Sequence, residues 1–151
     1  MGIEESYNFR RIADGVTTSG VVGAKRLSGL AEEGYGAVIN LLPDGGEWSV
    51  DDEQAIVEGQ GLEYVYIPVD WAAPKTADLE AFSAAMDRVG AGEGRVHVHC
   101  AANFRVTAFY GLHCQRSGAW SSEQAAALVA DVWDPAEHPQ WETFIAENLA
   151  T

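Results

Sequence analysis

The chain has few cysteines, little positive charge and no long apolar run, and each shortage excludes a class of protein. No stretch approaches the roughly 18 consecutive apolar residues that indicate a membrane-spanning helix. Two cysteines, Cys100 and Cys114, are too few for a disulfide framework, so we expect reduced thiols. The opening residues MGIEES lack the basic and apolar regions of a signal peptide. Together these features predict a cytoplasmic protein.

Positive side chains are scarce throughout the sequence. Nine Lys and Arg residues stand against 23 Asp and Glu residues, which gives a formal net charge of −14. Nucleic-acid binding needs a basic footprint, and an acidic surface is repelled by anionic lipid, so we expect neither nucleic acid nor membrane as a partner. A positive residue inside a candidate site is therefore informative.

The pattern of apolar residues predicts one α/β domain over residues 1–151, with strands and helices alternating. Ser49 and Thr76 are the predicted N-terminal caps of the second and third helices. The alternation indicates a central, mostly parallel sheet of about five strands flanked by helices. Strands are expected over 7–12, 16–19, 37–42, 62–69 and 95–99, and helices over 22–34, 49–59, 76–89, 104–116, 121–132 and 139–149.

A cysteine lies between a buried strand and a helix in the segment RVHVHCAANFRVT, residues 95–107. A helix N-terminus favours an anion through its dipole and its free N–H groups, so Cys100 is a candidate thiolate nucleophile, although most free cysteines are small core residues. Arg105 follows in the first helical turn, where a positive charge opposes the dipole. Its position is favourable if an anion, such as a phosphate held by the guanidinium fork, lies between it and the loop amides.

An acidic residue, Asp70, comes directly after the predicted strand 62–69. The carboxyl ends of parallel strands meet at one edge of a sheet, so Asp70 and Cys100 are expected to share that edge although 30 residues separate them. A carboxylic acid there could protonate a leaving oxygen and later activate water. The simpler interpretation is a turn residue.

Two histidines precede the cysteine on alternate positions of the strand. His97 and His99 are expected on the same face, His97 in the core and His99 bonded to the loop backbone, where it would steady the cysteine. His-x-His-Cys is too short a ligand set for a metal site, and no second cluster of ligands occurs, so we expect no metal. Cys114 is either a core thiol or a resolving partner for Cys100.

The order strand, His, Cys, loop, Arg and helix, with an upstream Asp, resembles the cysteine-dependent protein tyrosine and dual-specificity phosphatases. A bacterial branch of small phosphatase-like proteins is more similar still, over roughly residues 8–115. The segments that carry this resemblance are NFRRIADGVTTSG, AVINLLPD, EYVYIPVDW, AFSAAMD and VHVHCAANFRVTAFY.

The resemblance implies a dual-specificity-phosphatase-like fold, no cofactor, and hydrolysis of a phosphotyrosine-like or small aryl phosphate through a phosphocysteine on Cys100. It implies that Asp70 is the general acid and that Arg105 holds the phosphoryl oxygens. His99 and Thr107 would support the site. The phosphate- or oxyanion-binding loop would consist of Ala101, Ala102, Asn103 and Phe104.

The active loop is one residue shorter than the one it resembles. The familiar loop has five residues between cysteine and arginine, whereas four separate Cys100 from Arg105 here, and Val106 occupies the usual arginine position. Asn103 falls on a glycine position that often needs a positive φ angle, which Asn tolerates. Two alternatives therefore stay open: a rhodanese-like sulfurtransferase with a persulfide on Cys100, and a catalytically weak module that binds an oxyanion or phospho-ligand.

Overall fold

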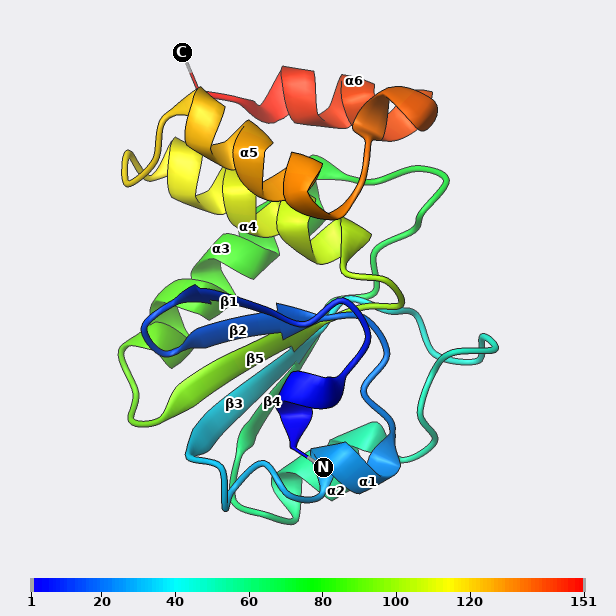
Figure 1. Ribbon diagram of the computed structural model, residues 1–151, viewed down its shortest axis with the longest axis vertical. Coiled ribbons are helices and arrows are strands. Elements are labelled where there is room, and N and C mark those ends of the chain that lie inside the picture. The colour runs from blue at the N-terminus through cyan, green and yellow to red at the C-terminus, as the bar shows by residue number, and fades with distance from the viewer. Residues whose placement is uncertain (1, 151) are drawn as a thin grey trace.

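A five-stranded sheet lies between two layers of helices in the computed structural model, which describes residues 2–150 (Figure 1). The spatial order is β1-β2-β5-β3-β4, with β1 antiparallel to β2 and the other neighbouring strands parallel. The predicted α/β fold with a mostly parallel sheet is thus confirmed. The strands are β1 (Arg10–Ala13), β2 (Val16–Ser19), β3 (Tyr35–Asn40), β4 (Glu63–Tyr66) and β5 (Arg95–His99).

The helices divide unequally between the two sides of the sheet. Two short helices, α1 (Ala24–Leu27) and α2 (Glu53–Glu58), lie below the sheet in Figure 1. The longer helices lie above it, and α4 packs against α3, α5 and α6. These are α3 (Thr76–Gly90), α4 (Phe104–Arg116), α5 (Ser122–Val132) and α6 (Pro139–Asn148), with 3-10 turns at Ile3–Glu5 and Pro135–Glu137.

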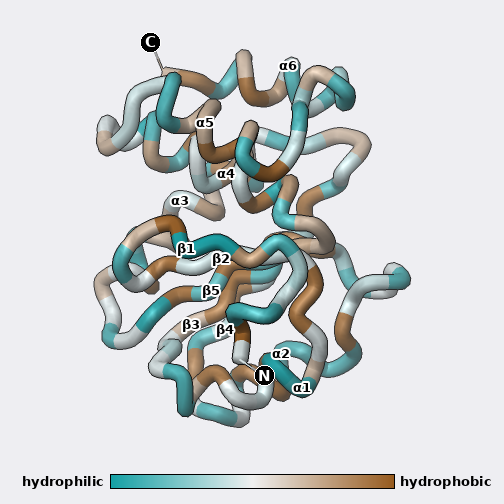
Figure 2. The backbone as a smooth tube through the Cα atoms, in the orientation of Figure 1, coloured by the Kyte–Doolittle hydropathy of each residue, from teal (hydrophilic) through white to brown (hydrophobic). Residues whose placement is uncertain are grey.

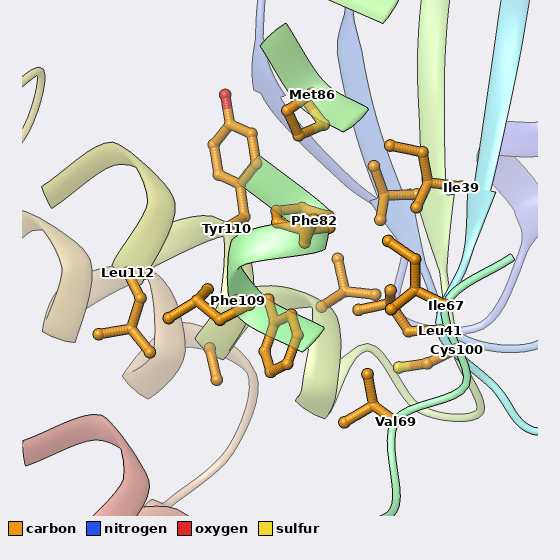
Figure 3. Packing of buried hydrophobic residues seen from close by; sticks show 14 of the residues in the cluster. Ile39, Leu41, Ile67, Val69, Phe82, Met86, Cys100, Phe109, Tyr110 and Leu112 are labelled. Carbon is orange, nitrogen blue, oxygen red and sulfur yellow. The ribbon is translucent and has the colours of Figure 1, made fainter. Parts of the chain in front are cut away.

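Alternation along the strands sends apolar side chains to both sides of the sheet. Ile39 and Val98 contribute to a large core beneath α3–α6, whereas Val38 belongs to a smaller core beneath α1 and α2. Figure 3 shows the large core, in which Phe82 and Phe109 pack toward the sheet. In Figure 2 the outer strand β1 changes from a hydrophilic start to an apolar end, and apolar stretches run through the middle of the sheet.

The two short helices differ most from their predictions. The helix expected over 22–34 is limited to α1, because the chain turns through Gly29 and reaches Gly34 with a φ of 89°. α2 begins at Glu53, so Ser49 is not its cap. The Ser49 hydroxyl instead donates to the Gly46 carbonyl at 3.0 Å and closes a loop turn.

The longer elements agree closely with the sequence patterns. β5 and α4 have the predicted bounds, and Ser121 caps α5 with a capping box. Thr76 is not the cap of α3, because Lys75 occupies that position and the Thr76 hydroxyl donates to the Asn148 side chain. No helix within residues 2–150 is both long enough and apolar enough to cross a membrane.

Candidate active site

Cys100 lies at the carboxyl end of the central strand β5, on the side of the large core. Its backbone N–H donates to the Ser19 carbonyl of β2 at 3.3 Å. The residue is 0% exposed, and Figure 3 shows its side chain among Leu41, Ile67 and Val69 of the core. The thiol therefore lies inside the protein, beneath the loop that follows, and is not part of the outer surface.

The loop between Cys100 and α4 is fixed by the segment before β1 and the segment after β2. The Ala101 carbonyl accepts from the Val21 N–H at 2.9 Å, and the Ala102 carbonyl accepts from the Asn8 side chain at 3.0 Å. Gly20 packs so closely against the loop that a Cβ there would collide with the Ala101 carbonyl. The path of the loop is thus determined by its neighbours as well as by its own sequence.

Asn103 is the N-cap of α4 and has a φ of 70°, which confirms the left-handed backbone predicted for this position. It is fully buried. Its side-chain nitrogen donates to the Asn8 carbonyl at 2.8 Å and to the Thr18 hydroxyl at 3.0 Å. Asn103 therefore provides the sharp turn and connects it by hydrogen bonds to the N-terminal part of the chain.

Thr107 closes the loop from the side of the helix. Its buried hydroxyl lies 2.9 Å from the Asn103 carbonyl, to which it donates, and it accepts from the Trp133 indole N–H at 2.9 Å. The hydroxyl therefore links the loop turn to the segment that follows α5. These contacts support the loop conformation.

Arg105, and not the residue after it, carries positive charge at the rim of the loop. Val106 occupies the usual arginine position of the longer loop but is 0% exposed and packs in the large core. The guanidinium carbon of Arg105 lies 5.4 Å from the centroid of the Trp71 ring, within cation–π range. Its Nε is buried and has no hydrogen-bond partner within residues 2–150. An unpaired buried donor of this kind is suited to an oxyanion ligand.

The loop that carries Asp70 reaches the same edge of the sheet, as predicted. Asp70 follows β4, which is separated from β5 only by β3, and its exposed carboxylate accepts from the Ala72 N–H at 2.9 Å. The next residue, Trp71, contacts Phe104 with ring centroids 6.1 Å apart. Trp71, which directly follows Asp70, thus lies against both Phe104 and Arg105, although the two segments are far apart in the sequence.

His99 does not bond the loop backbone, so that prediction is wrong. Its Nε2 lies 2.6 Å from Oε2 of Glu53, and both side chains are only 3% exposed. Alternation along β5 directs His99 away from the core that holds Cys100, toward the first turn of α2, where Glu53 begins the helix. The sequence offered no signal for this pair beyond an acidic residue at a helix start.

His97 is a core residue, as predicted, and lies on the same face as His99. The two rings are stacked with centroids 6.2 Å apart. The ring nitrogens of His97 contact the hydroxyls of Thr17 and Ser19, each at 2.8 Å. Burial lowers the pKa of His97 well below 6.5, and the adjacent His99 adds to this effect. No group of three or more His, Cys, Asp or Glu side chains suited to a metal ion occurs within residues 2–150.

Cys114, the second thiol, lies in the middle of the helical layer. It is buried and free, as is Cys100. Burial raises the pKa of the Cys114 thiol, and a hydrogen bond with Tyr110 partly opposes this shift. These surroundings agree with the interpretation of Cys114 as a core thiol.

A cavity of about 580 Å³ lies on the α2 side of the molecule, apart from the residues described above. Its lining is rich in carboxylates and includes neither Cys100, Asp70 nor Arg105. Its lining includes Glu53, whose partner His99 lies on the side of the sheet opposite to Cys100. Despite its size, this cavity is a poor candidate for a phosphate site, because its carboxylates repel an anion.

Comparison with known proteins shows the family of the chain. Residues 8–127 match the family described as "Beta-lactamase hydrolase-like protein, phosphatase-like domain". A beta-lactamase hydrolase-like protein of Xylella fastidiosa (strain Temecula1) is 32% identical over 120 residues, which are 78% of this chain and 27% of that protein. The chain therefore spans about a quarter of the length of the curated relatives it matches.

Solved structures extend the likeness to the whole fold. A candidate phosphatase of the DUF442 family from Shewanella putrefaciens CN-32 is 36% identical, with a TM-score of 0.83 over 96% of this chain and 93% of that chain. TpbA from P. aeruginosa, crystallised as a cysteine-to-serine variant in complex with pTyr, is 14% identical. Its TM-score is 0.71 over 91% of this chain and 82% of that chain, a likeness of fold alone.

Proposed function

Because the chain belongs to the family of phosphatase-like domains of the beta-lactamase hydrolase-like proteins, we propose that it hydrolyses phosphomonoesters with Cys100 as the nucleophile. The family match supports a phosphatase, a hydrolase, as the class of enzyme, and the fold agrees with the predicted likeness to dual-specificity phosphatases. One observation carries the proposal further. Arg105 has an unpaired buried donor beside the loop over Cys100, with Asp70 on the adjoining loop.

The reaction proceeds in two displacements at phosphorus. The Cys100 thiolate attacks in line, so that an S–P bond forms as the bond to the leaving oxygen breaks, and Asp70 gives its proton to that oxygen. Asp70, now a carboxylate, takes a proton from the water that attacks the phosphocysteine. The S–P bond then breaks, which releases inorganic phosphate and restores both the thiolate and the protonated Asp70.

The negative charge of the transferring phosphoryl group lies mainly on its equatorial oxygens, where preorganised donors are most effective. The loop amides of residues 101–104 and the N-terminus of α4 supply such donors, and Arg105 adds a full positive charge. Trp71 orients the guanidinium and so compensates for the shorter loop, in which the position of Val106 is directed into the core.

A phosphotyrosine-like or small aryl phosphate is the substrate class we favour. The aromatic wall formed by Trp71 and Phe104 suits an aryl group, and the fold relative TpbA was crystallised in complex with pTyr. The net charge of −14 disfavours highly anionic partners such as nucleic acid or acidic membranes. We place the protein in the cytoplasm as part of this proposal, on the small number of cysteines in the sequence.

Hydrolysis of p-nitrophenyl phosphate tests the proposal directly. We expect Cys100→Ser to lower kcat/KM at least about a thousandfold, and Asp70→Asn and Arg105→Ala to lower it about a hundredfold. Cys114→Ser is the matched control, because it removes the other thiol and should retain activity. A wild-type rate no higher than that of Cys100→Ser would overturn the proposal.

Two parallel measurements separate the alternatives. Transfer of sulfur from thiosulfate to cyanide, abolished by Cys100→Ser, would identify a sulfurtransferase with a persulfide on Cys100. Binding of inorganic phosphate without turnover, weakened by Arg105→Ala, would identify the non-catalytic binding module. Neither alternative is favoured by the family to which the chain belongs.

A further inference from the structure

The loop that carries Asp70 has no regular secondary structure of its own. Residues 67–75 form neither helix nor strand. The part from Asp70 to Thr76, the first residue of α3, is called the 70–76 loop. The Asp70 carboxylate accepts a hydrogen bond from the Ala72 N–H of this same loop. A general acid must nevertheless be held within hydrogen-bond reach of the leaving oxygen. The position of Asp70 therefore depends on what anchors this loop.

The last helix, α6, anchors the beginning of the loop. The Trp71 carbonyl accepts two hydrogen bonds from α6, one from the Trp141 indole N–H at 2.9 Å and one from the Gln140 side chain at 3.3 Å. The Trp71 and Trp141 rings are also stacked, with centroids 5.3 Å apart and planes inclined by 30°. Trp141 is fully buried, so its indole is a fixed donor.

The same helix anchors the end of the loop. The Thr76 hydroxyl, at the start of α3, donates to Oδ1 of Asn148 at 3.0 Å. Asn148 is buried, and its side-chain nitrogen donates to the Phe144 carbonyl at 2.9 Å, which fixes the orientation of the amide. Trp141 and Asn148 are seven residues apart, or about two helical turns, so they lie on one face of α6.

Figure 1 shows the arrangement: the chain leaves β4, rises along one side of the molecule toward α6, and only then enters α3. At the anchored end, Trp71 is in contact with the guanidinium of Arg105. One residue thus connects α6 with both Asp70, its neighbour in sequence, and Arg105, its neighbour in space.

We infer that Trp141 and Asn148 are positioning residues for phosphate-ester cleavage, and that α6 holds the 70–76 loop in the conformation in which Asp70 can donate its proton. This inference rests on the proposed function of Asp70. Both side chains are buried, so we assign neither a contact with substrate. They act through Trp71 and Thr76, which carry the two ends of the loop.

A general acid matters most when the leaving group is a poor one, and this separates positioning from mere packing. The variant Trp141→Phe retains an aromatic ring but removes the N–H donor. We expect it to lower kcat/KM for phenyl phosphate about tenfold, and that for 2,4-dinitrophenyl phosphate less than about twofold. Thr76→Val, at an exposed position that tolerates substitution, should show the same selectivity with a smaller effect.

The matched control is Trp120→Phe. Trp120 packs against Tyr110 at the turn between α4 and α5, away from the 70–76 loop. Its replacement should leave the ratio of the two kcat/KM values unchanged. In an Asp70→Asn background, Trp141→Phe should cause no further loss on phenyl phosphate, because the group it positions is already absent. Equal losses on both substrates, or a full additional loss in that background, would overturn the inference.

Amide hydrogen exchange of residues 71–76 provides a measurement that does not depend on turnover. We expect faster exchange in Trp141→Phe and Thr76→Val than in wild type or Trp120→Phe. Unchanged exchange in both variants would overturn the anchoring role of α6. If wild type hydrolyses neither ester, the proposed function fails, and the role of Asp70 fails with it. Faster exchange would then still establish the anchor alone.

Discussion

The two faces of strand β5 carry different kinds of residue to the same edge of the sheet. On one face, Val96 and Val98 lead to Cys100 through the large apolar core. On the other face, His97 and His99 form a buried polar row that ends at Glu53. The apolar and the polar row lie on opposite faces of β5. Only the apolar row ends at Cys100, where the loop to α4 begins.

This difference shows that polar side chains close in sequence to the proposed nucleophile can point to the opposite side of the sheet. His99 is adjacent to Cys100, but its hydrogen bond runs to Glu53 on the opposite side of the sheet. The group that contacts the loop comes instead from a distant segment, since Trp71 packs against Phe104 and Arg105. We therefore expect changes on the polar face to act on stability and changes at the loop to act on catalysis.

The largest effect on the polar face should come from breaking its buried pair. Glu53→Ala removes one partner and leaves the other without its hydrogen bond in a buried site, so we expect the free energy of unfolding in urea to fall by about 3–5 kcal/mol. Glu53→Gln keeps the shape and a polar contact, and should lose only about 1 kcal/mol. Its kcat/KM should stay within about threefold of wild type. A hundredfold loss in a stably folded Glu53→Gln would place the polar face in the catalytic machinery.

A matched pair of threonines tests the two faces with the same chemical change. Thr17 bonds His97 and Tyr35 on the polar face, whereas Thr107 bonds Asn103 and Trp133 at the loop. Replacing either by Val removes a buried hydroxyl, and each change should lower the free energy of unfolding by about 1–3 kcal/mol.

Activity should distinguish the two threonine variants. Thr107→Val loosens the loop over Cys100 and should lower kcat/KM for an aryl phosphate about tenfold or more, because small displacements of reacting groups are costly. Thr17→Val should leave kcat/KM of the folded protein nearly unchanged. Equal activities in the two variants would remove the distinction between the faces.

The smallest effect is a dependence of stability on pH. The folded protein holds the pKa of His97 well below 6.5, mainly because the ring is buried. Between the folded and unfolded pKa values, the unfolded chain binds a proton that the folded chain does not. Stability is therefore fully present above pH 6.5 and falls as the pH drops toward the folded pKa, by at most about 1.4 kcal/mol per pH unit for this group.

Urea unfolding between pH 7.5 and 5 measures this slope. His97→Gln should flatten it. His113→Gln is the matched control and should flatten it less, because burial also lowers the pKa of His113 but the nearby Asp87 opposes the shift. A slope for His97→Gln that equals the wild-type slope would show that His97 does not titrate as expected.

Much of this architecture was predictable because its strongest patterns are local. β5 alternates strictly and α4 repeats at helical spacing, so their bounds follow from the sequence alone. The positive φ of Asn103 and the common edge of Asp70 and Cys100 were also predicted, the first from turn chemistry and the second from the topology of parallel sheets.

The remaining features depend on contacts between segments that no local pattern connects. The pairing of His99 with Glu53 joins residues 46 positions apart. The contact of Trp71 with Arg105 joins residues 34 positions apart, and it gives the shortened loop its charged rim. Short helices are also weakly specified, since α1 and α2 have too few residues for periodicity or capping signals to fix their ends.

The hydrogen bonds that connect α6 with the 70–76 loop affect where the boundary of this domain should be placed. The family match ends at residue 127, whereas the anchoring residues Trp141 and Asn148 lie beyond it. A fragment trimmed to the matched boundary would keep Cys100, Asp70 and Arg105 in its sequence but lose the support of the acid loop. In this chain, the functional unit that we propose therefore extends past the matched segment to include α6.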